Sequence, residues 1–285
     1  MMSKIKVAEL FYSLQGEGKF SGTPSIFLRT FGCNFTCAGF GMPRGLQSTE
    51  ADLVAASVDK YTEYEQLPLV TTGCDSYASW HPAFKHLSPL LTVDAIVERT
   101  MELLPNRRWM SEHLVITGGE PLLGWQRSYP ELLDHANMKS LCEMTFETNG
   151  TQPLTPQFAE YLKQWTGESG RTRDSLTFSV SPKLSVSGEK WEDAIKPDTV
   201  CSYEDVGYTY LKFVVATDSD VEEALAATRS YRSAGFRGPV YLMGVGGTED
   251  VFFKTNKDVA LLAMKHGLRY SDRMQVGLFR NAWGT

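Results

Sequence analysis

The stretch Ser25-Ile-Phe-Leu-Arg-Thr-Phe-Gly-Cys-Asn-Phe-Thr-Cys37 joins two patterns that together decide the fold. Residues 25–31 are rich in β-branched and aromatic side chains, which is typical of a buried strand. Cys33 and Cys37 follow in the loop, with three residues between them. The stretch therefore predicts a strand that carries two cysteines at its carboxyl end.

The same alternation of strand and loop recurs from residue 111 onward. Short β-rich runs at 113–117, 143–147, 176–180, 211–215, 240–243 and 274–278 predict strands, and the amphipathic stretches between most of them predict helices. Together with residues 25–31 they make about six or seven β/α units. The expected fold class is α/β, with a parallel sheet curved into a complete or partial barrel. In such barrels the chemistry gathers at the carboxyl ends of the strands.

One region departs from this alternation. Residues 38–92 are polar and interrupted by glycine and proline, with a helix expected around 50–61. We interpret 38–92 as an insertion within a single domain that spans residues 1–285.

The composition excludes several classes of function. The formal charge is -6, from 28 basic and 34 acidic residues, so the chain lacks the net positive charge that binds the phosphate backbone of nucleic acid. An apolar run of about 18 residues is missing, which argues against a membrane-spanning helix. The first residues do not resemble a signal peptide, so a cytoplasmic protein is expected. Five cysteines in such a protein are thiols rather than a disulfide framework.

The cysteine pair alone is ambiguous. Soft thiolates suit an iron-sulfur cluster, but two unrelated cysteines would give the same spacing. Zinc sites prefer matched pairs of cysteines, and a second pair is missing. Phe40 stands where a third closely spaced cysteine would be expected. Cys142 and Cys201 are expected to be small residues of the core.

Further motifs carry a resemblance to a known family. The Cys33/Cys37 loop together with Gly118-Gly-Glu-Pro121 resembles the radical S-adenosylmethionine superfamily. Within it, the motifs 13–18 (SLQGEG), 24–29 (PSIFLR), 147–150 (ETNG) and 181–184 (SPKL) resemble the 7-carboxy-7-deazaguanine synthase family. The resemblance is carried by residues 13–184.

The resemblance implies a cofactor set and its ligands. Three cysteines of this family hold a [4Fe-4S] cluster, whose open iron binds S-adenosylmethionine. The radical formed from S-adenosylmethionine removes hydrogen from 6-carboxy-5,6,7,8-tetrahydropterin, and the ring then contracts with loss of ammonia. Carried onto this chain, the residues around S-adenosylmethionine are Gly118, Gly119, Glu120, Glu147, Asn149, Ser181, Pro182 and Lys183.

The substrate side is implied in the same way. The residues expected to contact the pterin are Leu14, Gln15, Gly16, Glu17, Arg29, Thr117 and Thr285. Arg29 suits this role because a guanidinium pairs with a carboxylate through two parallel hydrogen bonds. Cys74-Asp75-Ser76 resembles the end of the family's cysteine loop, so Cys74 is the expected third ligand and Ser76 the expected Mg2+ ligand. His81 and His86 are interpreted as surface residues.

The departures from the family leave alternatives open. Residues 38–73, 36 in all, separate Cys37 from Cys74, and the segment that follows Gln275 lacks the family's histidine. The rivals are a glycyl-radical activating enzyme and a barrel protein that has lost catalysis. The family also implies a homodimer and an electron donor such as flavodoxin or ferredoxin, with no nucleic acid and no membrane as partner.

Overall fold

Buried strands form one continuous sheet through the molecule. The structure, a computed structural model, describes residues 3–168 and 170–285. Within those residues nine strands pair in the order β3-β1-β2-β4-β5-β6-β7-β8-β9. Their bounds are β1 Lys4–Leu14, β2 Pro24–Thr30, β3 Leu90–Thr92, β4 His113–Gly118, β5 Met144–Thr148, β6 Leu176–Val180, β7 Tyr208–Val215, β8 Val240–Gly244 and β9 Arg269–Ser271.

The sheet is mostly parallel. Neighbouring strands pair in parallel from β2 through β4 to β9, whereas β1 runs antiparallel to both β2 and β3. The expected α/β class with a large, mostly parallel sheet is thus confirmed. The long strand β1 was missed: polarity alternates only over residues 4–7, and the pattern is lost at the irregularity between Val7 and Glu9.

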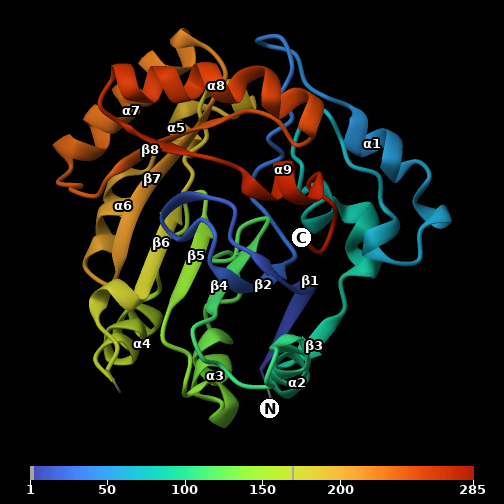
Figure 1. The fold of residues 1–285 in the computed structure, drawn as a ribbon, viewed down its shortest axis with the longest axis vertical. Helices are drawn as coiled ribbons and strands as arrows, with labels where there is room; N and C mark the ends of the chain where they lie inside the picture. Colours follow the sequence, from blue (N-terminus) through green and yellow to red (C-terminus); the bar gives the residue numbers. More distant parts are fainter. Residues whose placement is uncertain (1–2, 169) are drawn as a thin grey trace.

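Most helices cover the outer face of the sheet, but the first lies beside it and the last lies on the side of the cavity (Figure 1). Their bounds are α1 Glu50–Ala55, α2 Val93–Leu103, α3 Tyr129–Asp134, α4 Pro156–Thr166, α5 Trp191–Ala194, α6 Pro197–Glu204, α7 Asp218–Ser233, α8 Glu249–Lys265 and α9 Met274–Phe279. None of the helices in the described ranges is long and apolar enough to cross a membrane.

Local sequence explains where the clearest helices begin. At α4, the Thr155 hydroxyl accepts the backbone N–H of Phe158, and Pro156 occupies the first turn. At α7, Thr217 and Asp220 form a capping box. The main core then lies between these helices and the sheet, and includes the stacked rings of Phe146 and Phe178.

Two predicted elements differ in the structure. Residues 274–278, predicted as a strand, belong to helix α9, because only Val276 of that helix is buried and no strand of the sheet pairs with it. The helix expected around 50–61 ends as α-helix at Ala55, and a separate 3-10 turn covers Val58–Lys60.

Residues 38–92 lie beside the sheet, on the right of Figure 1, and together with Ala8 of β1 they build a second, smaller apolar cluster. We call it the satellite cluster. Its buried members are Ala8, Tyr64, Leu67, Val70, Tyr77, Ala78 and Phe84. Trp283, from the far end of the sequence, packs against it, with its ring 4.9 Å from that of Tyr64 and 5.8 Å from that of Tyr77.

Candidate active site

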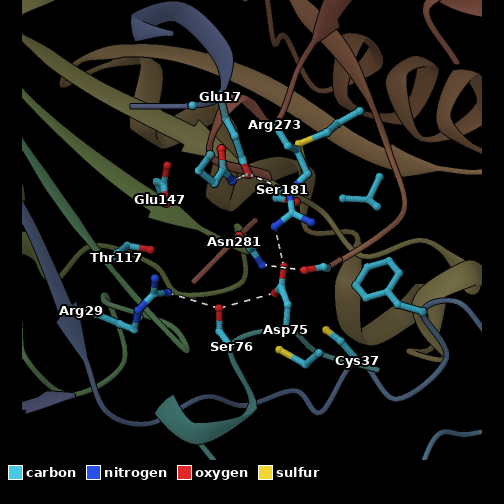
Figure 2. A pocket seen from close by; sticks show the side chains of 18 of the residues that line it. Glu17, Arg29, Cys37, Asp75, Ser76, Thr117, Glu147, Ser181, Arg273 and Asn281 are labelled. Atoms are coloured by element: carbon cyan, nitrogen blue, oxygen red, sulfur yellow. Dashed lines mark hydrogen bonds and ion pairs between the residues drawn. The ribbon is translucent and has the colours of Figure 1, made fainter. Parts of the chain in front are cut away.

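A cavity opens at the carboxyl ends of the parallel strands. Nearly all the residues predicted for the site line it: Leu14, Gln15, Gly16, Glu17, Arg29, Cys33, Cys37, Cys74, Ser76, Thr117, Gly118, Gly119, Glu147, Asn149, Ser181, Lys183 and Thr285. Figure 2 shows ten of the lining side chains labelled around the cavity. The structure therefore brings most of the predicted residues into one cavity, including Cys74 and Ser76 from the region 38–92, and their roles stay predictions.

Strand register explains why polar side chains share this cavity. Arg29 on β2 lies opposite Thr117 on β4, and Glu147 on β5 lies opposite Ser179 on β6. Residues paired across parallel strands point to the same face of the sheet. The inner face of this otherwise apolar sheet thus carries a layer of hydrogen-bonding groups near its carboxyl edge.

The three cysteines converge on one side of the cavity. Cys33, Cys37 and Cys74 pack with Phe35, Phe40 and Ala194 in one cluster. Burial raises the pKa of Cys33 to about 12 and that of Cys74 to about 11, and the thiols are near enough for their charges to act on one another. Phe40, at the position of the missing cysteine, fills space among these thiols.

This donor set suits a cluster better than a single ion. No group of three or more His, Cys, Asp or Glu within residues 3–168 and 170–285 converges tightly enough to hold a metal ion. A four-iron cluster gives each thiolate its own iron, so its ligands surround a volume rather than a point. Three soft thiols on one wall fit that requirement, and the charge of Lys183 offsets part of the rise in pKa that burial causes in each.

Arg29 is held by a buried carboxylate. Its Nε donates to Glu9 Oε2 at 2.6 Å, and its Nη1 donates to Ser76 Oγ at 3.2 Å. The Ser76 hydroxyl in turn lies 3.5 Å from Asp75 Oδ1, and Asp75 Oδ2 accepts from Arg273 Nη2 at 2.5 Å. Figure 2 shows Arg29, Ser76, Asp75 and Arg273 in this row across the cavity.

Glu17 lies at the other end of the row and binds two cations. Its carboxylate accepts from Lys212 Nζ, from Arg273 Nε at 3.1 Å and from Gln275 Nε2 at 2.9 Å. Burial alone would raise the pKa of Glu17, but the charges of Lys212 and Arg273 outweigh it and hold that pKa at about 2. Glu17 is therefore ionised at neutral pH.

Sequence reasoning missed both of these cations. Lys212 is only 4% exposed and interrupts the apolar run of β7, which was a usable signal because a lysine is rarely buried without a partner. Arg273 comes just before α9, in a segment without a recognisable pattern. Both line the cavity, as does Asp75.

Two predicted residues do not line the cavity. Glu120 is fully buried, and its carboxylate accepts from the backbone N–H of Leu122 and Asn149 and from the Thr148 hydroxyl. It thus ties the loop after β4 to the end of β5, and burial raises its pKa to about 7. Pro182 is buried between the lining residues Ser181 and Lys183.

Glycine allows the β4 loop to approach the cysteines closely. A Cβ on Gly119 would lie 2.5 Å from Gly32 O and 2.7 Å from Cys33 Cβ. Since real side chains do not come so close, only glycine fits here. The predicted contact between this loop and a ligand bound beside Cys33 is sterically reasonable.

The remaining cysteines and histidines lie elsewhere. Cys142 was expected in the core but is exposed, because it precedes β5 in a surface loop. Cys201 on α6 is half-buried, with its thiol near the backbone oxygen of Ala234. His81 contacts Asp52, and neither His81 nor His86 lines the cavity.

Residues 281–285 close the cavity from the side of the satellite cluster. Asn281 Nδ2 donates to Gly247 O, Trp283 Nε1 donates to Leu67 O at 2.7 Å, and Gly284 N donates to Glu9 Oε1 at 3.0 Å. Thr285 lines the cavity, as the resemblance implied.

Comparisons with known proteins point to one family name. No family model matches the chain. The chain is 32% identical over 294 residues to a 7-carboxy-7-deazaguanine synthase of Halobacterium salinarum, covering 98% of this chain and 91% of that protein. A 7-carboxy-7-deazaguanine synthase of Pyrobaculum aerophilum is 28% identical over 281 residues, covering 99% and 97%. The fold is similar to that of a crystal structure of QueE from Escherichia coli, with a TM-score of 0.52 and 18% identity over 94% of this chain and 93% of that one.

Proposed function

The chain belongs to the 7-carboxy-7-deazaguanine synthase family of radical S-adenosylmethionine enzymes, and from this premise we propose its reaction and the roles of its residues. The reaction is the ring contraction of 6-carboxy-5,6,7,8-tetrahydropterin to 7-carboxy-7-deazaguanine with loss of ammonia, in queuosine-type 7-deazapurine biosynthesis. By its chemistry the enzyme is a carbon-nitrogen lyase. The observation that carries the proposal is that Cys33, Cys37 and Cys74 share one cavity with Arg29, Thr117 and Glu147.

Cys33, Cys37 and Cys74 are the proposed ligands of a [4Fe-4S] cluster, and Gly118, Gly119, Glu147, Asn149, Ser181 and Lys183 the proposed contacts of S-adenosylmethionine. When bound, these cofactors supply the hydrogen-abstracting radical. The protein's own task is to position the substrate and to exclude water from the reacting atoms. Glu120 and Pro182 do not line the cavity and are proposed to support residues that do. Glu120 bonds to Thr148 and Asn149, and the buried Pro182 fixes the loop of residues 181–183.

Arg29 is the proposed partner of the substrate carboxylate. In the described part of the chain, Nε and Nη1 each donate one hydrogen bond, to Glu9 and Ser76. A guanidinium has five N–H donors, so the end of Arg29 still has donors for a ligand. Glu9 keeps the side chain charged and oriented, because its buried carboxylate raises the pKa of Arg29 further.

Ser76 is the proposed Mg2+ ligand. Mg2+ binds proteins through few ligands and completes its shell with water and substrate oxygens. The Ser76 hydroxyl lies between Arg29 and Asp75, so a substrate carboxylate held by Arg29 would reach a cation at this hydroxyl. Asp75 adds negative charge beside it.

Residues 14–17, at the end of β1 and in the loop after it, are the remaining proposed substrate contacts. Leu14, Gln15, Gly16 and Glu17 line the cavity, and Gln15 Nε2 donates to Glu147 Oε1 at 3.0 Å. A pterin has an amide-like ring edge that needs both donors and acceptors, and an ionised Glu17 supplies acceptors there. Thr285, which lines the same cavity, is the proposed substrate contact from the C-terminal segment.

Three further parts of the proposal are carried by the family resemblance alone. They are a homodimeric assembly, a cytoplasmic location and a flavodoxin or ferredoxin as electron donor. The names of the similar proteins favour this reaction over a glycyl-radical activating enzyme.

The test is anaerobic incubation of reconstituted protein with S-adenosylmethionine, reductant, Mg2+ and 6-carboxy-tetrahydropterin. We expect 7-carboxy-7-deazaguanine, detected by mass spectrometry. Formation of 5'-deoxyadenosine without that product would leave a radical enzyme but reject the substrate.

Cysteine variants test the cluster directly. Cys74→Ala should lose the iron, the sulfide and the electron-resonance signal of the reduced cluster, whereas the exposed Cys142→Ala should keep all three. An intact cluster in Cys74→Ala would reject Cys74 as the third ligand.

A further inference from the structure

The loop that carries Cys33 and Cys37 rests on a second loop that has no assigned role, residues 184–189. The two loops meet at backbone level: Gly39 N donates to Ser187 O at 2.8 Å. A Cβ on Gly39 would lie 2.5 Å from Gly188 N, so the contact leaves no room for a side chain. The cysteine loop is therefore docked on this surface rather than free in solvent.

Glu189 makes the most specific contact between the two loops. Its Oε1 accepts the backbone N–H of Thr36 at 3.0 Å and that of Cys37 at 2.8 Å, and lies 3.4 Å from the Thr36 hydroxyl. Backbone N–H groups bonded to a carboxylate form strong, charge-assisted hydrogen bonds. One carboxylate oxygen thus fixes two successive peptide units at Cys37.

Cys37 needs such a partner because of its backbone conformation. Its φ is +50°, in the left-handed region that residues other than glycine rarely adopt. Such conformations persist only where the surroundings hold them. This conformation directs the buried Cys37 thiol into the cluster of Cys33 and Cys74.

We propose that Glu189 is a positioning residue that holds Cys37 in its left-handed conformation and so prearranges the cysteine loop for its cluster. A second effect follows from its charge. A fixed anion beside an iron-sulfur cluster disfavours the addition of an electron, since net charge and hydrogen bonding set the reduction potential. Glu189 therefore also makes the cluster harder to reduce. The positioning role concerns the chain itself, whereas the effect on the potential rests on the proposed function.

The variants Glu189→Gln and Glu189→Ala separate the two effects. Glutamine keeps an oxygen that can accept both N–H groups but removes the charge, and alanine removes both. Glu223→Ala is the matched control: Glu223 accepts from the backbone N–H of Ser185 at 2.8 Å, in the same second loop, without touching the cysteine loop.

The first measurement is amide hydrogen exchange of residues 33–39 in the metal-free protein. We expect exchange at Thr36 and Cys37 to accelerate at least about tenfold in Glu189→Ala, and to stay near wild type in Glu189→Gln and Glu223→Ala. Wild-type exchange in Glu189→Ala would overturn the positioning role.

The second measurement uses the reconstituted protein. Glu189→Ala should lose iron to a chelator faster than wild type, while Glu189→Gln should retain it and show a more positive midpoint potential. An unchanged potential in Glu189→Gln would overturn the charge effect. A wild type that takes up no iron would instead reject the proposed function, and the exchange data would still decide whether Glu189 holds the loop.

Discussion

Lys212→Met removes one of the two cations that neutralise Glu17 and keeps nearly the same side-chain volume. The Lys212 and Glu17 side chains are 5% and 14% exposed, so the pair lies largely out of water. The wild-type row Lys212, Glu17, Arg273 and Asp75 carries two positive and two negative charges. The variant leaves two carboxylates for the single guanidinium of Arg273.

Removing one partner of a buried ion pair costs about 3 to 5 kcal/mol in unfolding free energy. We expect about 3 kcal/mol at pH 7, the lower end, because Arg273 and Gln275 still bond to Glu17. The cost should depend on pH. The pKa of Glu17 is held at about 2, below its ordinary value of 4.5, so its stabilising contribution is present above pH 4.5 and is lost as the pH falls toward 2. Without Lys212 the pKa of Glu17 rises. In the variant Glu17 therefore takes up a proton at a higher pH than in the wild type, which removes its uncompensated charge.

Urea unfolding of the metal-free protein at pH 7 and pH 4 measures both effects. The difference between wild type and Lys212→Met should narrow at pH 4. The double variant Lys212→Met/Glu17→Gln should recover most of the loss, since no carboxylate is then left without its cation. A loss below about 1 kcal/mol at pH 7, or an equal loss at both pH values, would refute this reasoning.

Three other changes test the site. Arg29→Lys keeps a cation for the buried Glu9 but loses the planar guanidinium, so kcat/KM should fall about 100-fold, roughly 3 kcal/mol, with iron content unchanged. Equal kcat/KM in the variant and the wild type would show that Arg29 does not bind the substrate. Ser76→Ala should require more Mg2+ for turnover in a Mg2+ titration, and an unchanged requirement would show that Ser76 is only a loop hydroxyl. Glu120 has its pKa raised to about 7, so its contribution to stability is full below pH 4.5 and is lost as the pH rises through 7. In urea unfolding, the free energy of unfolding of the wild type should fall by about 2 kcal/mol between pH 5 and pH 8, and Glu120→Gln should abolish this fall. The same pH profile in both proteins would show that Glu120 is ionised throughout.

The sequence predicted those parts of the fold that depend on local pattern. Strand β6 alternates apolar and hydroxyl side chains and is buried throughout, and it was predicted with its true bounds, residues 176–180. Helix α7 lies between the predicted strands 211–215 and 240–243, where an amphipathic stretch predicted a helix. Helix α9 was predicted as a strand because a short apolar run fits either structure, and only contacts with the rest of the chain decide between them.

Local pattern also decided which residues of the candidate site could be predicted from the sequence and which could not. Motif resemblance pointed to Cys33, Arg29 and Thr117, which lie at or just after the carboxyl ends of β2 and β4. It also pointed to Cys74 in the region 38–92, and all four residues line one cavity. It did not identify Arg273, whose partners Glu17 and Asp75 lie 256 and 198 residues away in the sequence. Ion pairs between such distant segments leave no local trace in composition or periodicity.

The packing of Trp283 on the satellite cluster has a consequence for the order of events during synthesis. One wall of the cavity joins residues 58–87 to residue 283, so it cannot form until residue 283 has been made. Cys33, Cys37 and Cys74 are translated roughly 200 residues earlier. At about 5 to 20 residues per second, these thiols wait roughly 10 to 40 s on the ribosome before the wall that shields them exists. During that interval they are open to oxidants and to stray metal ions, and a cluster can assemble on the folded site only after residue 283 has been made.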